Sequence, residues 1–171
     1  MKTEIRNPSE TLDALDLQLL DALQRDAGRS NQELAALLGI SPPTCLRRVR
    51  RLRDLGVIER QVAILNPQAL ARLAGPGLQA LVEVTLERQN ADTLDAFEQL
   101  ACAHDAVQQC WRVAPGPDFI LVLACRDMPH YQQVSQALFA EHSNVRNAKT
   151  FFVTQRAKFS THSAPLADMH K

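Results

Sequence analysis

The sequence has 171 residues, enough for one sizeable hydrophobic core or two small ones. Its composition, 46% hydrophobic and 22% charged, is that of an ordinary globular protein. Because the net charge is zero, the whole chain is not a basic nucleic-acid binder, and any basic character must be local.

The cysteines and the apolar segments exclude several further classes. The four cysteines form no C-x-x-C pair and have no histidine at metal-ligand spacing, so we expect neither a structural zinc nor a cofactor. The opening residues MKTEIRNPSET lack the apolar core of a signal peptide, and the longest apolar run, at 119–125, is too short to span a bilayer. We therefore expect a cytoplasmic protein with reduced thiols and no membrane partner.

Two helices are predicted at the start of the chain. Leucines recur at helical spacing over residues 12–27, and Gly28 stands where a C-terminal cap is expected. Ser30 and Glu33 form a capping box that begins a second helix of about two turns, which stops at Gly39.

A third helix and a wing are predicted next. Ser41 can cap this helix, Pro42 suits its first turn, and Gly56 ends it. Helices joined by so short a turn are typical of a helix-turn-helix. Residues 57–65 are rich in β-branched side chains and predict a strand or short hairpin, which indicates a winged variant.

The rest of the chain has a different period. Residues 66–77 predict a connector with one short helical turn. The segments that follow predict a strand at 78–86, a helix at 92–103, strands at 107–113 and 119–126, a helix at 131–141 and a strand at 147–154. This β-α-β-β-α-β order indicates a ferredoxin-like domain, so the fold class is α+β.

These segments define the expected domain organisation: an N-terminal tail at 1–11, a winged helix-turn-helix at 12–65, a linker at 66–77, a ferredoxin-like domain at 78–159 and a flexible polar tail at 160–171. A single sheet with helices on one side leaves its other face uncovered, which favours pairing with a second copy of the chain.

The third predicted helix carries a basic cluster. Residues 41–60 contain six arginines and two acids, whereas residues 1–40 contain four basic and seven acidic side chains. Thr44, Arg47, Arg48 and Arg51 are spaced to share one face of the helix, which we expect to point outward. A merely solvated face is the alternative, but 41–53 contains no acid, and the preceding turn favours DNA binding.

On this interpretation each residue has a role in the complex with DNA. Ser41, Pro43 and Thr44 would set the register of the helix, and Arg60 in the wing would contact the backbone. The arginines expected to contact bases and phosphates are Arg47, Arg48 and Arg51.

Three motifs in this region resemble a known family. Ser41-Pro42-Pro43-Thr44-Cys45, the arginine-rich run at 48–52 and Gly56-Val57-Ile58 are similar to the helix-turn-helix of the Lrp/AsnC (leucine-responsive, feast-or-famine) transcription regulators. The similarity extends over about residues 12–158. It implies a homodimer, often assembled into an octamer, that binds a palindromic operator in double-stranded DNA and often responds to an amino-acid-like effector.

The resemblance also implies an effector site. In this family a turn of the form G-x-x-D-(Y/F) helps to hold the effector between neighbouring dimers. The corresponding turn here has proline where the first glycine is expected, and proline supplies no amide hydrogen. The implied effector residues are Pro115, Gly116, Asp118, Phe119, Met128, Thr150 and Phe152. Alternative roles are open: a turn residue for Asp118, ordinary sheet positions for Thr150 and Phe152, and a core position for Met128.

Other functions are weighed against this one. The five histidines lie at no catalytic or metal spacing and no nucleophile turn is recognisable, so we expect no enzymatic activity. An architectural DNA-binding protein that needs no effector, or a protein-interaction scaffold of the same fold, is the alternative to an effector-responsive regulator.

Overall fold

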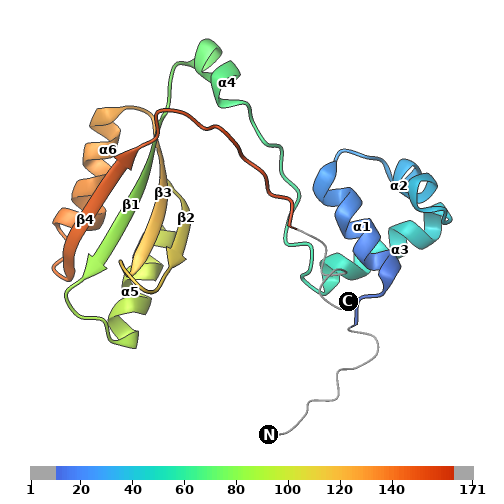
Figure 1. Ribbon diagram of the computed structural model, residues 1–171, viewed down its shortest axis with the longest axis horizontal. Coiled ribbons are helices and arrows are strands. Elements are labelled where there is room, and N and C mark those ends of the chain that lie inside the picture. The colour runs from blue at the N-terminus through green and yellow to red at the C-terminus, as the bar shows by residue number, and fades with distance from the viewer. Residues whose placement is uncertain (1–10, 164–171) are drawn as a thin grey trace, which may run out of the picture. The chain divides into compact units, whose positions relative to one another are not determined.

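The computed structural model describes residues 11–163, which form two compact units (Figure 1). Residues 11–64 together with 158–163 make up the first, here called the helical unit. Residues 65–157 make up the second, here called the sheet unit. Most of the predicted terminal tails, 1–10 and 164–171, lies outside the described residues.

The helical unit contains the three predicted helices, α1 (Ala14–Arg25), α2 (Asn31–Leu38) and α3 (Pro42–Asp54). The predicted capping box of α2 is present, and Gly39 ends the helix in the left-handed conformation with φ of 66°. A small core of side chains from all three helices holds them together: Leu19, Ala22, Leu34, Ala35, Cys45, Val49 and Leu52.

Two local expectations in this unit were wrong. α1 is capped at Asp26, which has extended backbone angles, and Gly28 follows two residues later in a turn. No strand forms over 57–65, although the structure describes all of these residues. Val62 and Ile64 are 65% and 54% exposed there. A β-branched run forms a strand only where a partner strand is available to it, because sheet preference depends on neighbours.

The sheet unit confirms the predicted β-α-β-β-α-β order. Its elements are α4 (Pro67–Ala74), β1 (Leu78–Leu86), α5 (Ala91–Cys102), β2 (Val107–Arg112), β3 (Phe119–Cys125), α6 (Met128–Ser135), the π-helix η2 (Gln136–Ala140) and β4 (Val145–Phe152). The connector helix α4 is two turns long instead of one, and every residue in it is at least partly exposed.

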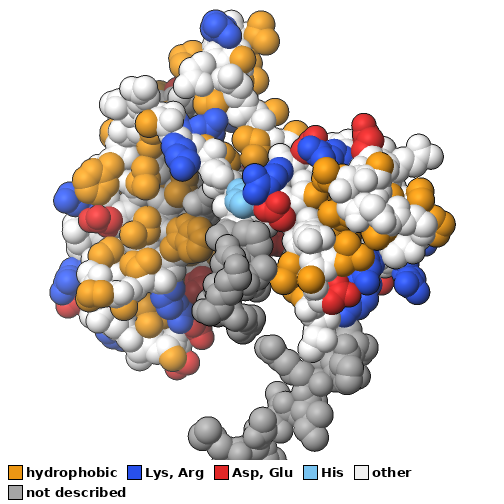
Figure 2. All heavy atoms as spheres, turned by 45° about the vertical axis from the view of Figure 1, so that its right-hand side comes forward, with side chains coloured by type: hydrophobic (Ala, Val, Ile, Leu, Met, Phe, Trp, Pro, Cys, Tyr) orange, Lys and Arg blue, Asp and Glu red, His pale blue; other side chains and the backbone are white. Residues whose placement is uncertain are grey.

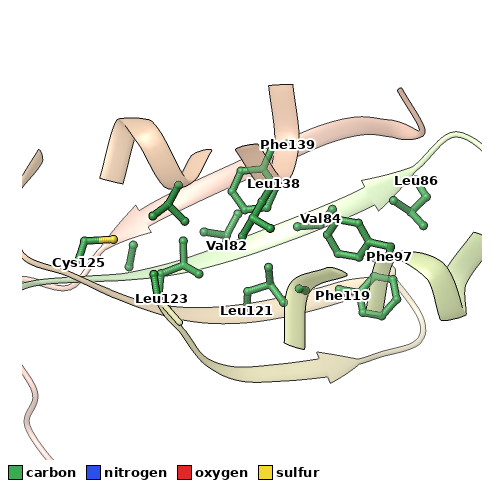
Figure 3. Close-up of a cluster of buried hydrophobic side chains, with 14 residues drawn as sticks. Val82, Val84, Leu86, Phe97, Phe119, Leu121, Leu123, Cys125, Leu138 and Phe139 are labelled. Atoms are coloured by element: carbon green, nitrogen blue, oxygen red, sulfur yellow. The ribbon is translucent and has the colours of Figure 1, made fainter. Parts of the chain in front are cut away.

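The four strands form one antiparallel sheet in the order β2-β3-β1-β4. Alternate residues of β1 and β3 face the helices, and Val82, Val84, Leu121 and Leu123 are fully buried there. Figure 3 shows them converging on Phe97 from α5 and on Leu138 and Phe139 from η2. This core positions both ends of the sheet, where the candidate ligand residues lie.

The other residues of the strands form the open face of the sheet. Leu81 on β1 lies between Val122 on β3 and Phe151 on β4 in the strand register. Trp111 on β2 pairs with Ile120 in the same way and is 57% exposed. Exposed hydrophobic side chains are visible on the left-hand body in Figure 2. Within residues 11–163, no helix is long and apolar enough to cross a membrane.

Candidate nucleic-acid interface and effector site

The exposed side of α3 is set by its buried stripe. Cys45, Val49 and Leu52 are buried against the other helices. Since successive residues of an α-helix are about 100° apart, the positions most nearly opposite this stripe are 43, 47 and 54, and positions 50 and 51 come next on either side. Arg47 and Arg50 are exposed, whereas Arg51 is partly buried. Of the arginines of α3, Arg47 therefore points most directly outward, and Arg50 is exposed beside it.

Arg48 and Arg51 instead point toward α1. The Nη1 atom of Arg48 lies 2.7 Å from Asp16 Oδ1 and 2.8 Å from Asp13 Oδ2. The Nη1 atom of Arg51 lies 2.9 Å from Asp16 Oδ2, and its Nη2 donates to the carbonyl oxygen of Thr11 at 2.8 Å. One carboxylate of α1 thus binds two arginines of α3.

Asp16 is an unusual residue in this unit because its carboxylate is only 1% exposed. The same side chain belongs to the N-terminal capping box of α1, in which Asp13 accepts from the Asp16 amide at 2.8 Å. This backbone hydrogen bond, with help from Arg48, lowers the pKa of Asp13. The two carboxylates in turn raise the pKa of the Arg48 guanidinium. The cluster therefore joins the start of α1 to the middle of α3.

The expectation of one shared outward face is corrected by this geometry. Spacing groups Thr44, Arg47, Arg48 and Arg51 within about 100° of the helix circumference, but the partners on α1 draw the last two arginines inward. Of these four residues, only Arg47 points outward as the sequence predicted. Thr44 is partly buried at the edge.

The N-terminus of α3 also differs in detail from the prediction. The Ser41 hydroxyl bonds to the Thr44 hydroxyl at 2.8 Å instead of capping a backbone amide. Pro42 and Pro43 carry no amide hydrogen, so the helix end offers fewer donors to a phosphate than most helices do. Asn31 of α2 donates to the carbonyl oxygen of Pro42 at 2.8 Å and fixes the turn between the two helices.

Beyond α3, the remaining predicted DNA contact is Arg60. Its side chain is 76% exposed and lies 3.7 Å from Glu59, in the extended segment where the wing was expected. Arg53 bonds to the side chain of Gln61 in the same segment.

The predicted effector turn lies at one end of the sheet. Asp118 accepts hydrogen bonds from the amide of Leu86 at 2.7 Å and from Nε2 of Gln89 at 3.2 Å. Its own amide donates to the carbonyl oxygen of Val84. Asp118 therefore attaches the turn to the end of β1. Pro115 follows a cis peptide bond, and Gly116 has a φ of 124°, which a residue with a side chain rarely adopts.

Phe119 has a place in the core. It is fully buried, and its ring packs on that of Phe97 with the centroids 4.9 Å apart (Figure 3). In this chain, its contribution to the predicted site is to anchor the turn.

Three further predicted effector residues gather at the other end of the sheet. The hydroxyl of Thr150 lies 2.7 Å from that of Tyr131, and the ring of Phe152 meets the Tyr131 ring edge-to-face at 5.0 Å. Met128 begins α6 one turn before Tyr131. Met128 is 43% exposed and Phe152 is 41% exposed. We call Met128, Tyr131, Thr150 and Phe152 the aromatic cluster.

The turn and the aromatic cluster are separated along β1. Asp118 bonds beside Val84, whereas Phe152 pairs with Ala80. Four residues of a strand span about 14 Å. The seven predicted effector residues therefore form two groups in one chain.

Comparison with known proteins identifies the family. The protein-family model for winged helix-turn-helix DNA-binding domains matches residues 12–59. The family model for the Lrp/AsnC ligand binding domain matches residues 79–162. The leucine-responsive regulatory protein of Haemophilus influenzae is 33% identical over 88% of this chain and 88% of its own. The chain belongs to the Lrp/AsnC family of transcriptional regulators.

Other members agree with this assignment. The leucine-responsive regulatory protein of Escherichia coli is 32% identical over 91% of this chain and 92% of its own. The Neisseria meningitidis transcriptional regulator solved in complex with L-Met is 29% identical, with a TM-score of 0.78 over 93% of this chain and 99% of that one. This Lrp/AsnC protein is thus a DNA-binding transcriptional regulator that carries a ligand-binding domain.

The structure of this Lrp/AsnC regulator adds two residues that sequence reasoning missed: Asp16 as the partner of two arginines and Tyr131 as the centre of the aromatic cluster. The sequence places Arg50 beside the basic face as a solvated arginine, and its side chain is exposed. Over residues 11–163, no three His, Cys, Asp or Glu side chains come together in a way that could hold a metal ion.

Proposed function

We propose that this regulator binds a palindromic operator as a homodimer and distinguishes its bases chiefly with Arg47 and Arg50. The observation that carries this proposal is the pairing of Arg48 and Arg51 with α1. This pairing leaves Arg47 and Arg50 as the arginines that face outward. Ser41, Pro43 and Thr44 set the approach of α3, and Arg60 contacts the DNA backbone. Arg48 and Arg51 hold α3 in place.

Replacement of Arg47 by alanine tests this assignment. Arg47→Ala should weaken operator binding by about 1–3 kcal/mol, because an arginine that bonds to a guanine edge is lost. The thermal stability should not change, since the side chain is exposed. The operator is first selected from random DNA by the wild-type protein, and binding is then titrated at fixed salt concentration.

Arg25→Ala is the matched control, because it removes the same charge from α1, where Arg25 is 64% exposed and pairs with Asp21. It should bind the selected operator nearly as well as the wild type. Equal affinities of Arg47→Ala and wild type would remove Arg47 from the interface.

We further propose that an amino acid with an apolar side chain is the effector, held by the aromatic cluster of one chain and the turn at 115–118 of another. The rings of Tyr131 and Phe152 offer apolar contact, and the hydroxyls of Tyr131 and Thr150 offer hydrogen bonds. Asp118 shapes the turn through its bonds to β1, and Gly116 allows close approach. The L-Met bound to the Neisseria regulator supports this class of ligand.

A thermal-shift screen of the twenty amino acids tests the effector. A ligand at 100 times its dissociation constant stabilises a protein by about 2.7 kcal/mol, so a true effector raises the melting temperature of the wild type. Phe152→Ala should lose that shift. Leu73→Ala, at a side chain that is 87% exposed on α4, should keep it. If no amino acid shifts the wild type, an architectural DNA-binding protein or interaction scaffold that needs no effector becomes the better interpretation.

The open face of the sheet supports the homodimer. An apolar surface of this kind, centred on Leu81, Val122 and Phe151, is typical of a protein interface. Two sheets packed face to face would bury it in each copy. We propose further assembly to an octamer on the family resemblance, and a cytoplasmic location because the DNA target lies there.

A further inference from the structure

Two ion pairs fix the register between α5 and the edge strand β2, and a ring contact packs α5 against the strand next to it. On α5, Phe97 packs against Phe119 of the neighbouring strand β3 (Figure 3). Arg112 of β2 places its Nη2 atom 2.7 Å from both Asp95 Oδ1 and Glu98 Oε2 of the helix. The middle of α5 therefore lies beside the end of β2.

The same register brings Cys102, at the C-terminal end of α5, close to Cys110 on β2. α5 and β2 are joined by a short turn and run in opposite directions, so a move toward the end of the helix is a move toward the start of the strand. From Glu98 to Cys102 the helix advances about 6 Å. From Arg112 back to Cys110 the strand advances about 7 Å on the same face. Cys102 therefore lies across from Cys110.

The side-chain directions agree with this placement. Cys110 pairs in the sheet with Leu121, which is fully buried beneath the helices, so both side chains face the helix layer. Cys110 also packs against the edge of that core. Burial and the adjacent Cys102 thiol raise the pKa of the Cys110 thiol to about 12. Cys102 is exposed at the end of α5, so a reagent reaches it first.

We propose that Cys102 and Cys110 are a modification site that forms a reversible disulfide when the protein meets hydrogen peroxide. The Cys102 sulfur attacks one peroxide oxygen, the O–O bond breaks, one water leaves, and a sulfenic acid remains. The Cys110 sulfur then attacks the Cys102 sulfur and displaces hydroxide, which takes the Cys110 proton and leaves as the second water. Two thiols lose two electrons and two protons, and the peroxide is reduced to two waters.

The disulfide would fasten the edge strand β2, with Trp111 on its opposite face, to the C-terminal end of α5. A crosslink between residues eight apart in the sequence restricts the unfolded chain, which stabilises the sheet unit. The other two cysteines serve as internal references for reactivity with peroxide. Cys45 is buried in the core of the helical unit, and Cys125 is buried in the core of the sheet unit.

Peptide mapping of the full-length protein tests the proposal. The protein is treated with hydrogen peroxide, denatured, alkylated without reductant and digested with a protease that cleaves at Asp105, because no Lys or Arg separates the two cysteines. We expect a peptide pair joined through Cys102 and Cys110 within one chain, while Cys45 and Cys125 are alkylated. Reduction with dithiothreitol should restore four alkylated cysteines. Four alkylated cysteines after peroxide, a disulfide only between chains, or Cys102 left as a sulfinic acid would each overturn the proposal.

Thermal unfolding gives a second readout. Peroxide should raise the melting temperature of the wild-type sheet unit by about 10–20 °C. The fluorescence of the single tryptophan, Trp111, reports the unfolding of this unit. Cys110→Ser, which keeps the size of the side chain, should show no such rise, and nor should Cys102→Ser. A rise of equal size in either variant would show that the stabilisation has another origin.

Discussion

Replacing Asp16 with asparagine is expected to lower the free energy of unfolding of the helical unit by about 2–4 kcal/mol. Removing one partner of a buried ion pair costs about 3–5 kcal/mol. We reduce this figure because the side chains of Arg48 and Arg51 are 23% and 32% exposed, so water compensates part of the loss. Asparagine keeps the shape of the side chain but removes the charge that balances two guanidinium groups.

The measurement must report on the helical unit itself. The only tryptophan and the only tyrosine, Trp111 and Tyr131, both lie in the sheet unit, so fluorescence is silent on this change. Hydrogen exchange of the amides of α1 and α3 is the suitable probe. Asp26→Asn is the control: its ion pair with Arg29 is long, at 3.4 Å, and Asp26 is 56% exposed. It should cost less than about 1 kcal/mol.

The same substitution should change DNA binding in a recognisable way. Arg48 and Arg51 would be released to meet phosphates, so the slope of the logarithm of affinity against the logarithm of salt concentration should steepen by about 1–2. Binding to unrelated DNA should strengthen at low salt more than binding to the operator. The role of this carboxylate would be contradicted if Asp16→Asn changed neither the hydrogen-exchange protection of α1 and α3 nor the salt dependence of DNA affinity.

Replacing Leu81 with glutamate is expected to convert the proposed homodimer into monomers. Leu81 lies on one of the two inner strands of the sheet, between Val122 and Phe151, at the centre of the open face. A carboxylate buried there without a partner costs several kcal/mol. A cost of about 3 kcal/mol would weaken the dimer by more than about 100-fold.

Sedimentation velocity over a range of concentrations measures this change. Leu100→Glu is a close control, because Leu100 is also 40% exposed but lies on α5, in the helix layer that covers the other face of the sheet. It should sediment like the wild type. Operator affinity should fall in Leu81→Glu even though Arg47 is intact, because two linked half-sites bind more tightly than one. A Leu81→Glu protein that sediments as the wild type does would exclude this face as the dimer interface.

Much of the fold could be predicted because its signals are local. The capping box of Ser30 and Glu33, the glycine after α2 and the alternation in β1 and β3 each lie within a few residues of the structure that they specify. The strand expected at 57–65 failed for the opposite reason, since a strand depends on a partner and local preference cannot show whether one exists.

The candidate sites were harder because their decisive contacts are distant in sequence. Arg48 and Asp16 are separated by 32 positions, as are Asp118 and Leu86, and no helical or strand period connects either pair. The arginine-rich run therefore predicted a DNA-binding helix without showing which arginines are bound by α1. Similarly, the motif at 115–119 predicted an effector turn without showing that Phe119 belongs to the core.

The C-terminal segment has a consequence for how the protein can be dissected. Residues 158–163 belong to the helical unit, where the side chain of Gln24 bonds to both the amide and the carbonyl of Ser163, at 2.8 and 3.4 Å. His162 Nε2 lies 2.8 Å from Asp21 Oδ1 in the same place. The helical unit is therefore assembled from two distant parts of the chain. A recombinant fragment that stops at Ile64 would lack residues 158–163 of its own domain, and a circularly permuted gene that joins this segment to the N-terminal one would include both parts.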